Sequence, residues 1–227
     1  MGKGITLVSI LGCNKNVEAT EKAIHHCLNN FDFDDVKFIS CVEVPSLEQY
    51  RVKINPLTYK EYNNFCVNSL NYFVDTNFCI TMQHDGFIID PSRWTDIFLN
   101  YDYIGSPWVV EPNNLVGNGG FSFRSKKFLI ESTKLEYNPN IMFPHMPPGT
   151  EHTPEDWFLC SYSYNKMKNA GVSFAPVNIA YEFAVEHPSQ IKSWVREDLS
   201  TYKSFGFHGH FNVAGMGVVH DKYNISN

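Results

Sequence analysis

A carboxylate at the end of a predicted strand is the first candidate for chemistry in this sequence. Asp85 follows the apolar run 78–83, with Gln83 and His84 before it and Gly86 after it. Glycine lets a ligand approach the backbone closely, and in open α/β sheets ligands bind at the carboxyl ends of strands. An aspartate placed there can hold Mg²⁺ or Mn²⁺ together with the phosphate oxygens of a substrate. An aspartate that only caps a turn is an equally good interpretation.

Two histidines near the end of the sequence form a second candidate. His208 and His210 are separated by one residue, so in an extended chain both imidazoles point to the same side. Either could complete a metal site that includes Asp85. Because the sequence holds 9 histidines, a chance pair on the surface is the competing interpretation.

Two adjacent carboxylates, Glu155 and Asp156, begin the predicted helix 155–167. The positive end of the helix dipole favours negative charge at this position. Asp156 could act as a general base that accepts the proton of an attacking hydroxyl. A charge pair that merely stabilises the start of the helix is the alternative, and the residues alone leave both interpretations open.

A glycine-rich segment at 117–120 could bring backbone amides close to a polar ligand, or it could be a plain turn. Its G-N-G-G sequence matches neither the dinucleotide-binding fingerprint nor the P-loop. The sequence also lacks G-x-S-x-G, H-E-x-x-H and the protein-kinase motifs, which argues against a serine hydrolase, a zincin and a kinase.

The elements that must position these residues alternate between strands and helices. The runs 5–11 and 36–42 are typical of buried parallel strands, and the amphipathic segment 17–29 between them predicts a βαβ unit. The fold class is therefore α/β. Further along the chain we expect helices at 59–74, 91–99, 125–132 and 155–167, an irregular connector at 45–56, a loop at 139–154, and strands at 78–83, 172–176 and 179–186.

Composition excludes several classes of protein. A chain of 227 residues with 43% hydrophobic content can bury one large core. The net charge is -6 and the basic residues are scattered singly, so we expect no nucleic-acid partner. No apolar run approaches the roughly 20 residues of a transmembrane segment. Six cysteines without a C-x-x-C pair predict buried thiols and a cytoplasmic, reducing location.

Several blocks, taken in order, resemble one family, that of small GT-A-type glycosyltransferase domains found in bacteria and large DNA viruses and first catalogued as a domain of unknown function. The blocks are Q-H-D-G at 83–86, Trp94, Y-D-Y-I-G-S-P-W at 101–108, V-G-N-G-G-F-S-F-R-S at 116–125 and E-D at 155–156. The resemblance implies one GT-A-like (Rossmann-type) domain over 1–227, with a mixed, mainly parallel sheet flanked by helices. The nucleotide-sugar part would span about 1–110 and the acceptor part about 111–227.

The resemblance also implies a function, the metal-dependent transfer of a sugar from a nucleotide-diphosphate sugar, with a UDP-sugar favoured, to a hydroxyl of a glycan or glycoprotein. Asp85 would take the place of the second aspartate of the GT-A D-x-D motif and bind Mn²⁺ or Mg²⁺. Gln83 stands at the first position of that motif, so only one carboxylate is available, and His208 would assist as a metal ligand. Asp156 would be the general base of an inverting reaction. We expect the donor to be contacted by Gln83, His84, Asp85, Gly86, Gly119, Gly120 and, from its place before the Asp85 strand, Asn63.

Three alternatives remain open. The single carboxylate leaves room for a non-catalytic nucleotide-sugar or carbohydrate-binding module on the same fold. A sugar-phosphate nucleotidyltransferase would need a glycine-rich basic loop after the first strand, which residues 12–15 do not supply. A metal-dependent hydrolase would use His84, Asp85, His208 and His210.

Overall fold

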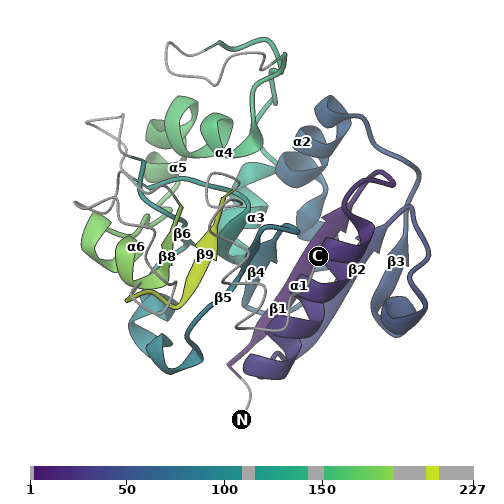
Figure 1. Ribbon diagram of the computed structural model, residues 1–227. Helices are drawn as coiled ribbons and strands as arrows, with labels where there is room; N and C mark the ends of the chain where they lie inside the picture. The colour runs from purple at the N-terminus through teal and green to yellow at the C-terminus, as the bar shows by residue number, and fades with distance from the viewer. Residues whose placement is uncertain (1–2, 109–115, 143–150, 187–202, 210–227) are drawn as a thin grey trace.

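A mixed sheet forms the centre of the protein (Figure 1). The computed structural model describes residues 3–108, 116–142, 151–186 and 203–209. In sheet order the six strands are β3 (Arg51–Lys53), β2 (Asp35–Ser40), β1 (Ile5–Leu11), β4 (Phe78–Met82), β7 (Phe121–Ser125) and β6 (Tyr103–Ile104). The first four are parallel, whereas β7 is antiparallel to both of its neighbours. The predicted α/β class with a mainly parallel sheet is confirmed.

Strand β1 is central because its sequence suits burial on both faces. Leu7 pairs with Val36 of β2 on one side and with Ile80 of β4 on the other. Six of the seven residues of β1 are buried. An almost continuous apolar run is what a parallel strand covered on both faces requires, and this is the pattern that the sequence shows.

Within the described ranges, six α-helical segments accompany the sheet, and the long helix α1 lies across β1 and β2 in the view of Figure 1. The helices are α1 (Val17–Asn30), α2 (Tyr59–Asn68), α3 (Lys126–Ser132), α4 (Glu155–Trp157), α5 (Tyr164–Asn169) and α6 (Val177–Phe183). Short 3-10 segments occur at η1 (Pro45–Tyr50), η2 (Leu70–Phe73), η3 (Pro91–Arg93) and η4 (Asp96–Asn100), and the π-helical turn η5 (Phe158–Tyr162) connects α4 with α5. Both α2 and α4 lie at the end of the sheet where β1 and β4 finish.

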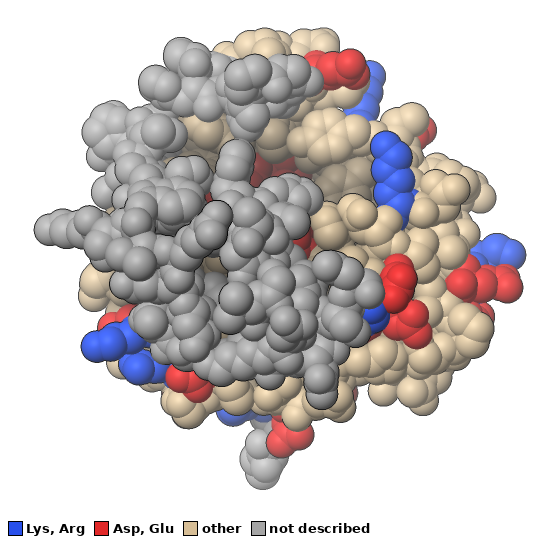
Figure 2. All heavy atoms as spheres, viewed as in Figure 1, with Lys and Arg blue, Asp and Glu red and all other residues tan. Residues whose placement is uncertain are grey.

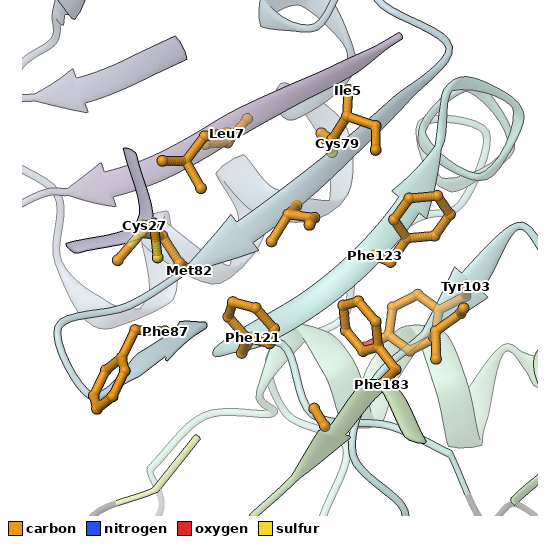
Figure 3. Packing of buried hydrophobic residues seen from close by; sticks show 14 of the residues in the cluster. Ile5, Leu7, Cys27, Cys79, Met82, Phe87, Tyr103, Phe121, Phe123 and Phe183 are labelled. Atoms are coloured by element: carbon orange, nitrogen blue, oxygen red, sulfur yellow. The ribbon is translucent and has the colours of Figure 1, made fainter. Parts of the chain in front are cut away.

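A second, three-stranded sheet packs beside β7. Its order is β5 (Gly86–Ile88), β9 (Gly206–His208) and β8 (Ala184–Val185). Aromatic rings pack where the two sheets meet, since Phe121 of β7 stacks on Phe183, the last residue of α6 before β8, with ring centroids 5.4 Å apart (Figure 3). Antiparallel pairing of β5 with β9 places Gly86 opposite His208. Residues from the middle and the end of the chain therefore meet at one place.

The predicted strands 5–11, 36–42 and 78–83 and the helices 17–29 and 125–132 are confirmed to within two residues, and the other predictions need correction. The predicted strand 172–176 is only an isolated bridge between Phe174 and Tyr103, and the predicted helix 91–99 consists of the 3-10 segments η3 and η4. The segment 179–186 is mostly helix α6, because Pro176 precedes its first turn and Ile179, Ala180 and Phe183 share a helical face. The connector 45–56 contains strand β3, which is too short to show alternation. The predicted helices 59–74 and 155–167 are interrupted, the first by η2 after Asn68 and the second by the π turn. Residues 143–150 of the predicted loop lie outside the described residues.

Candidate active site

A cavity of about 490 Å³ lies at the carboxyl end of β1. Because β2 lies on one side of β1 and β4 on the other, this is the point where the strand order reverses, the usual ligand position of an open α/β sheet. Residues 9–13, residues 57–59, Tyr62 and His84 contribute to its walls. The hydroxyl of Ser9 in this lining is buried and makes no hydrogen bond within the described part of the chain. The cavity therefore offers a polar group that a ligand can satisfy.

Asp85 and His208 meet beside this cavity. The pairing of β5 with β9 brings Oδ1 of Asp85 to 3.5 Å from Nε2 of His208, and Asp85 is only 1% exposed. Nδ1 of His208 lies 3.5 Å from Oε1 of Glu186. Burial lowers the pKa of His208, but hydrogen bonds and charge from Asp85 and Glu186 outweigh it and raise the pKa to about 10. Two carboxylates thus converge on one imidazole and favour a positive charge there.

Polar side chains of neighbouring loops fix the orientation of this pair. The side-chain amide of Asn118 lies 2.9 Å from Nδ1 of His208, and Asn118 adopts a left-handed backbone conformation with φ 66°. On the other side, Nδ1 of His84 lies 3.5 Å from Oδ1 of Asp85, while its Nε2 is 3.1 Å from the amide of Asn16. Sequence reasoning did not predict Asn118 or Glu186 as site residues. The position of Asn118 in the glycine-rich segment could have indicated it, whereas no sequence pattern indicates Glu186.

The glycines at 119 and 120 let the start of β7 lie against the site. A Cβ atom on Gly119 would stand 1.9 Å from Oε1 of Glu155, and one on Gly120 would stand 1.9 Å from Nε2 of His208. A Cβ atom on Gly86 would stand 2.3 Å from the carbonyl oxygen of Gly120. Any side chain at these positions would collide with the polar groups of the site. Their common role is close packing around Glu155 and His208.

Asp156 contacts the same glycine segment. Its Oδ2 accepts a hydrogen bond from the amide of Gly119 at 3.0 Å, and its Oδ1 accepts one from the amide of Trp157 at 2.8 Å. Burial, followed by the negative charge of Glu155, raises the pKa of Asp156 to about 7, although the two backbone hydrogen bonds oppose this shift. A carboxyl group with such a pKa can take up and release a proton near neutral pH.

Glu155 has a different task from Asp156. Its Oε1 accepts a hydrogen bond from Arg124 at 2.7 Å, and the two side chains are only 6% and 1% exposed. Its Oε2 accepts one from the amide of Asp156 at 2.8 Å. The Arg124 guanidinium is held in turn by the hydroxyl of Ser122, which accepts from its Nε at 2.9 Å. A buried ion pair therefore anchors the segment that carries Asp156.

The buried pair gives a testable expectation for stability. Replacing Glu155→Gln leaves the Arg124 cation buried without a counter-charge, a change that destabilises proteins by about 3–5 kcal/mol. We expect the thermal unfolding temperature to fall by roughly 10 °C for a chain of this size. The matched control is Glu131→Gln, which removes the surface ion pair with Lys134 and is expected to change stability by less than about 1 kcal/mol. Equal melting of Glu155→Gln and wild type would contradict the anchoring role.

Two of the residues predicted to contact a donor have structural partners. Asn63 is 1% exposed, its Oδ1 accepts from the amide of Glu155 at 2.8 Å, and its Nδ2 donates to the carbonyl of Tyr59 at 2.8 Å. Asn63 is thus placed to hold Glu155 and not to contact a donor, because both of its polar atoms are used. Gln83 lines the cavity, but its Nε2 donates to the hydroxyl of Tyr62 at 2.9 Å.

The structure brings most of the predicted site residues together. Asp156 and His208 flank the consecutive glycines 119 and 120, and Asp85 contacts His208. His210 lies outside the described residues. Within the described ranges, no group of three or more His, Cys, Asp or Glu side chains is arranged to hold a metal ion. On the face shown in Figure 2, Lys and Arg atoms occur singly and often beside acidic ones, with no basic stripe.

Comparisons with solved structures show a glycosyltransferase fold. A glycosyltransferase involved in glycosylation of the major capsid of PBCV-1 matches with a TM-score of 0.53 and 13% identity, over 98% of this chain and 99% of that chain. The galactosyltransferase LgtC, solved with donor and acceptor sugar analogues, matches with a TM-score of 0.50 and 10% identity, over 97% and 94% of the two chains. At these identities the likeness shows the fold alone.

The sequence itself places the chain in a family. The family model described as "Protein of unknown function (DUF5672)" matches residues 46–208, and the chain belongs to this family. A search of curated protein sequences gave no match. None of the helices in the described ranges is long and apolar enough to cross a membrane.

Proposed function

We propose that this protein is a metal-dependent glycosyltransferase that moves a sugar from a nucleotide-diphosphate sugar, with a UDP-sugar favoured, to a hydroxyl of a glycan or glycoprotein. The observation that carries the proposal is the convergence of Asp156 and His208 on the glycines 119 and 120, which adjoin the cavity at the switch point of the sheet through the hydrogen bond from the amide of Gln83 to the carbonyl of Gly120. The glycosyltransferase fold of the structural neighbours supports it.

Asp156 is the proposed general base. Its raised pKa lets it accept the proton of the acceptor hydroxyl as the new glycosidic bond forms, and the amide of Gly119 holds Oδ2 in place. A base on the acceptor side implies direct attack and therefore inversion at the sugar carbon. The wall of the cavity that residues 9–13 at the end of β1 form is the proposed nucleotide site, and the buried hydroxyl of Ser9 is available to bind the nucleotide there.

Asp85 and His208 fit the requirements of a divalent cation. A carboxylate oxygen and an imidazole nitrogen 3.5 Å apart can both contact one ion, which would take the place of the proton that Nε2 of His208 otherwise holds toward Asp85. Mn²⁺ and Mg²⁺ commonly use few protein ligands and complete their shell with water and substrate phosphates. When bound, the cation offsets the negative charge of the departing nucleoside diphosphate. Glu186 and Asn118 hold the imidazole in position.

A thermal-shift panel tests the proposal. UDP-, GDP-, dTDP- and CMP-sugars are each added with Mn²⁺, with Mg²⁺ and with chelator. A ligand at about 100 times its Kd stabilises the native state by about 2.7 kcal/mol, so we expect the melting temperature to rise by roughly 5–10 °C with one nucleotide family and only with metal. Release of free nucleotide in the presence of glycan acceptors then distinguishes an enzyme from a binding module. The absence of a shift with every nucleotide would contradict the proposal.

A further inference from the structure

Tyr59 is a large aromatic residue that the proposed mechanism does not use. It is the first residue of α2, its surface is 52% exposed, and it lines the cavity at the end of β1. A capping box fixes this end of the helix, because Thr58 accepts a hydrogen bond from the amide of Glu61 while the Glu61 carboxylate accepts one from the amide of Thr58. An exposed ring is therefore held on a rigid element at a ligand cavity.

The backbone of Tyr59 is tied to the segment that carries Asp156. Asn63 donates to the carbonyl of Tyr59 and accepts from the amide of Glu155, both at 2.8 Å. The phenol also responds to this segment, since burial and the charges of Asp156 and Glu155 raise the pKa of Tyr59 to about 12. The ring thus lines the cavity in its uncharged form, close enough to the proposed base to be affected by its charge.

We propose that Tyr59 contacts the acceptor and selects for a sugar ring, so that the acceptor hydroxyl reaches Asp156 from a pyranose stacked on Tyr59. This inference rests on the proposed function. Tyr59 belongs to the wall of the cavity that adjoins the segment with Asp156, because Asn63 bridges its carbonyl to the amide of Glu155 and the charge of Asp156 acts on its phenol. The end of β1 and His84 form other walls of the cavity. The electron-rich face of an aromatic ring attracts the weakly positive C–H groups on one face of a pyranose. The hydroxyls of the same sugar remain free to point at the Asp156 carboxylate.

The experiment compares Tyr59→Ala and Tyr59→Phe with wild type. Methyl α- and β-D-hexopyranosides serve as acceptor probes, in transfer assays and in saturation-transfer NMR with the nucleoside diphosphate bound. We expect Tyr59→Ala to raise the acceptor KM about three- to tenfold, the effect of losing one aromatic contact, while Tyr59→Phe stays close to wild type. Nucleotide affinity and the slow hydrolysis of donor by water should stay unchanged in both variants. Tyr72→Ala, which removes a 74% exposed tyrosine on η2, is the matched control.

Each contrary result has a distinct meaning. A loss of nucleotide affinity in Tyr59→Ala would assign the ring to the nucleotide and overturn the acceptor role. An unchanged acceptor KM, or no binding of any methyl glycoside to wild type that binds nucleotide, would also overturn it and leave the proposed function standing. Failure of wild type to bind any nucleotide would instead refute the proposed function itself.

Discussion

Replacing Asp156→Asn is expected to remove glycosyl transfer while nucleotide binding is retained. Asparagine has nearly the shape of aspartate, and its amide oxygen can still accept the hydrogen bond from the amide of Gly119. It cannot accept a proton from the acceptor hydroxyl. A positioned general base contributes about 10²- to 10⁴-fold to a reaction rate, so kcat should fall by that factor. The measurement pairs single-turnover transfer with calorimetric titration of the nucleotide.

The control for this variant is Asp75→Asn, which removes an exposed carboxylate just before β4, at the opposite end of that strand from Asp85. Its transfer rate should equal that of wild type. A thermal melt of each variant separates loss of the base from loss of the fold. Retained turnover in Asp156→Asn would exclude the base assignment and, with it, the argument for inversion.

The same assignment fixes the direction of the pH dependence. The base works as the ionised carboxylate, and the pKa of Asp156 is raised from the ordinary aspartate value to about 7. Transfer should therefore be fully present well above pH 7 and be lost as the pH falls through this value, with about a tenth of the groups ionised one pH unit below. The remaining activity of Asp156→Asn should not decrease as the pH falls through 7.

Sequence reasoning found those parts of the candidate site that follow local rules. The long apolar run of β1 and the strand before Asp85 indicated an α/β sheet, and ligands of such sheets bind where strands end. The E-D pair was found from its place at a helix start. The sequence could not distinguish the roles of its two members. Arg124 on β7 is buried and forms an ion pair with Glu155, not with Asp156, and this contact depends on tertiary packing.

Long-range pairing explains what sequence reasoning missed. Short strands such as β3, β5 and β9 have three residues each and exist only because a neighbour pairs with them. The contact of Glu186 with His208 depends on the pairing of β8 with β9 in the three-stranded sheet, so no local sequence pattern predicts it. Asn63 shows the opposite case. A polar residue before the Asp85 strand suggested a ligand contact, whereas burial and two hydrogen bonds make it a support for Glu155.

Asp85 carries the second large expected effect. It is almost fully buried and meets His208 at 3.5 Å, and in the proposed site these two side chains would hold the cation. Replacing Asp85→Ala should reduce the Mn²⁺-dependent affinity for nucleotide to the level that wild type shows with chelator. The loss should be at least about 10- to 100-fold, because removing a residue that only orients a metal ligand already costs that much. Calorimetric titrations with Mn²⁺, Mg²⁺ and chelator measure it.

Further variants separate metal binding from folding. Asp85→Asn keeps the side-chain volume and should lose metal dependence. Because it also removes a buried carboxylate that faces His208, we expect its melting temperature to fall, and a nucleotide affinity with chelator equal to that of wild type shows that the fold is retained. His208→Ala should cause a similar loss, and the double variant should lose little more than either single one, because residues that act on one ion are not additive. The surface variant Asp75→Asn should bind as wild type does. Unaltered Mn²⁺-dependent affinity in Asp85→Ala would refute the metal site, and the proposal would then need another source of charge for the departing diphosphate.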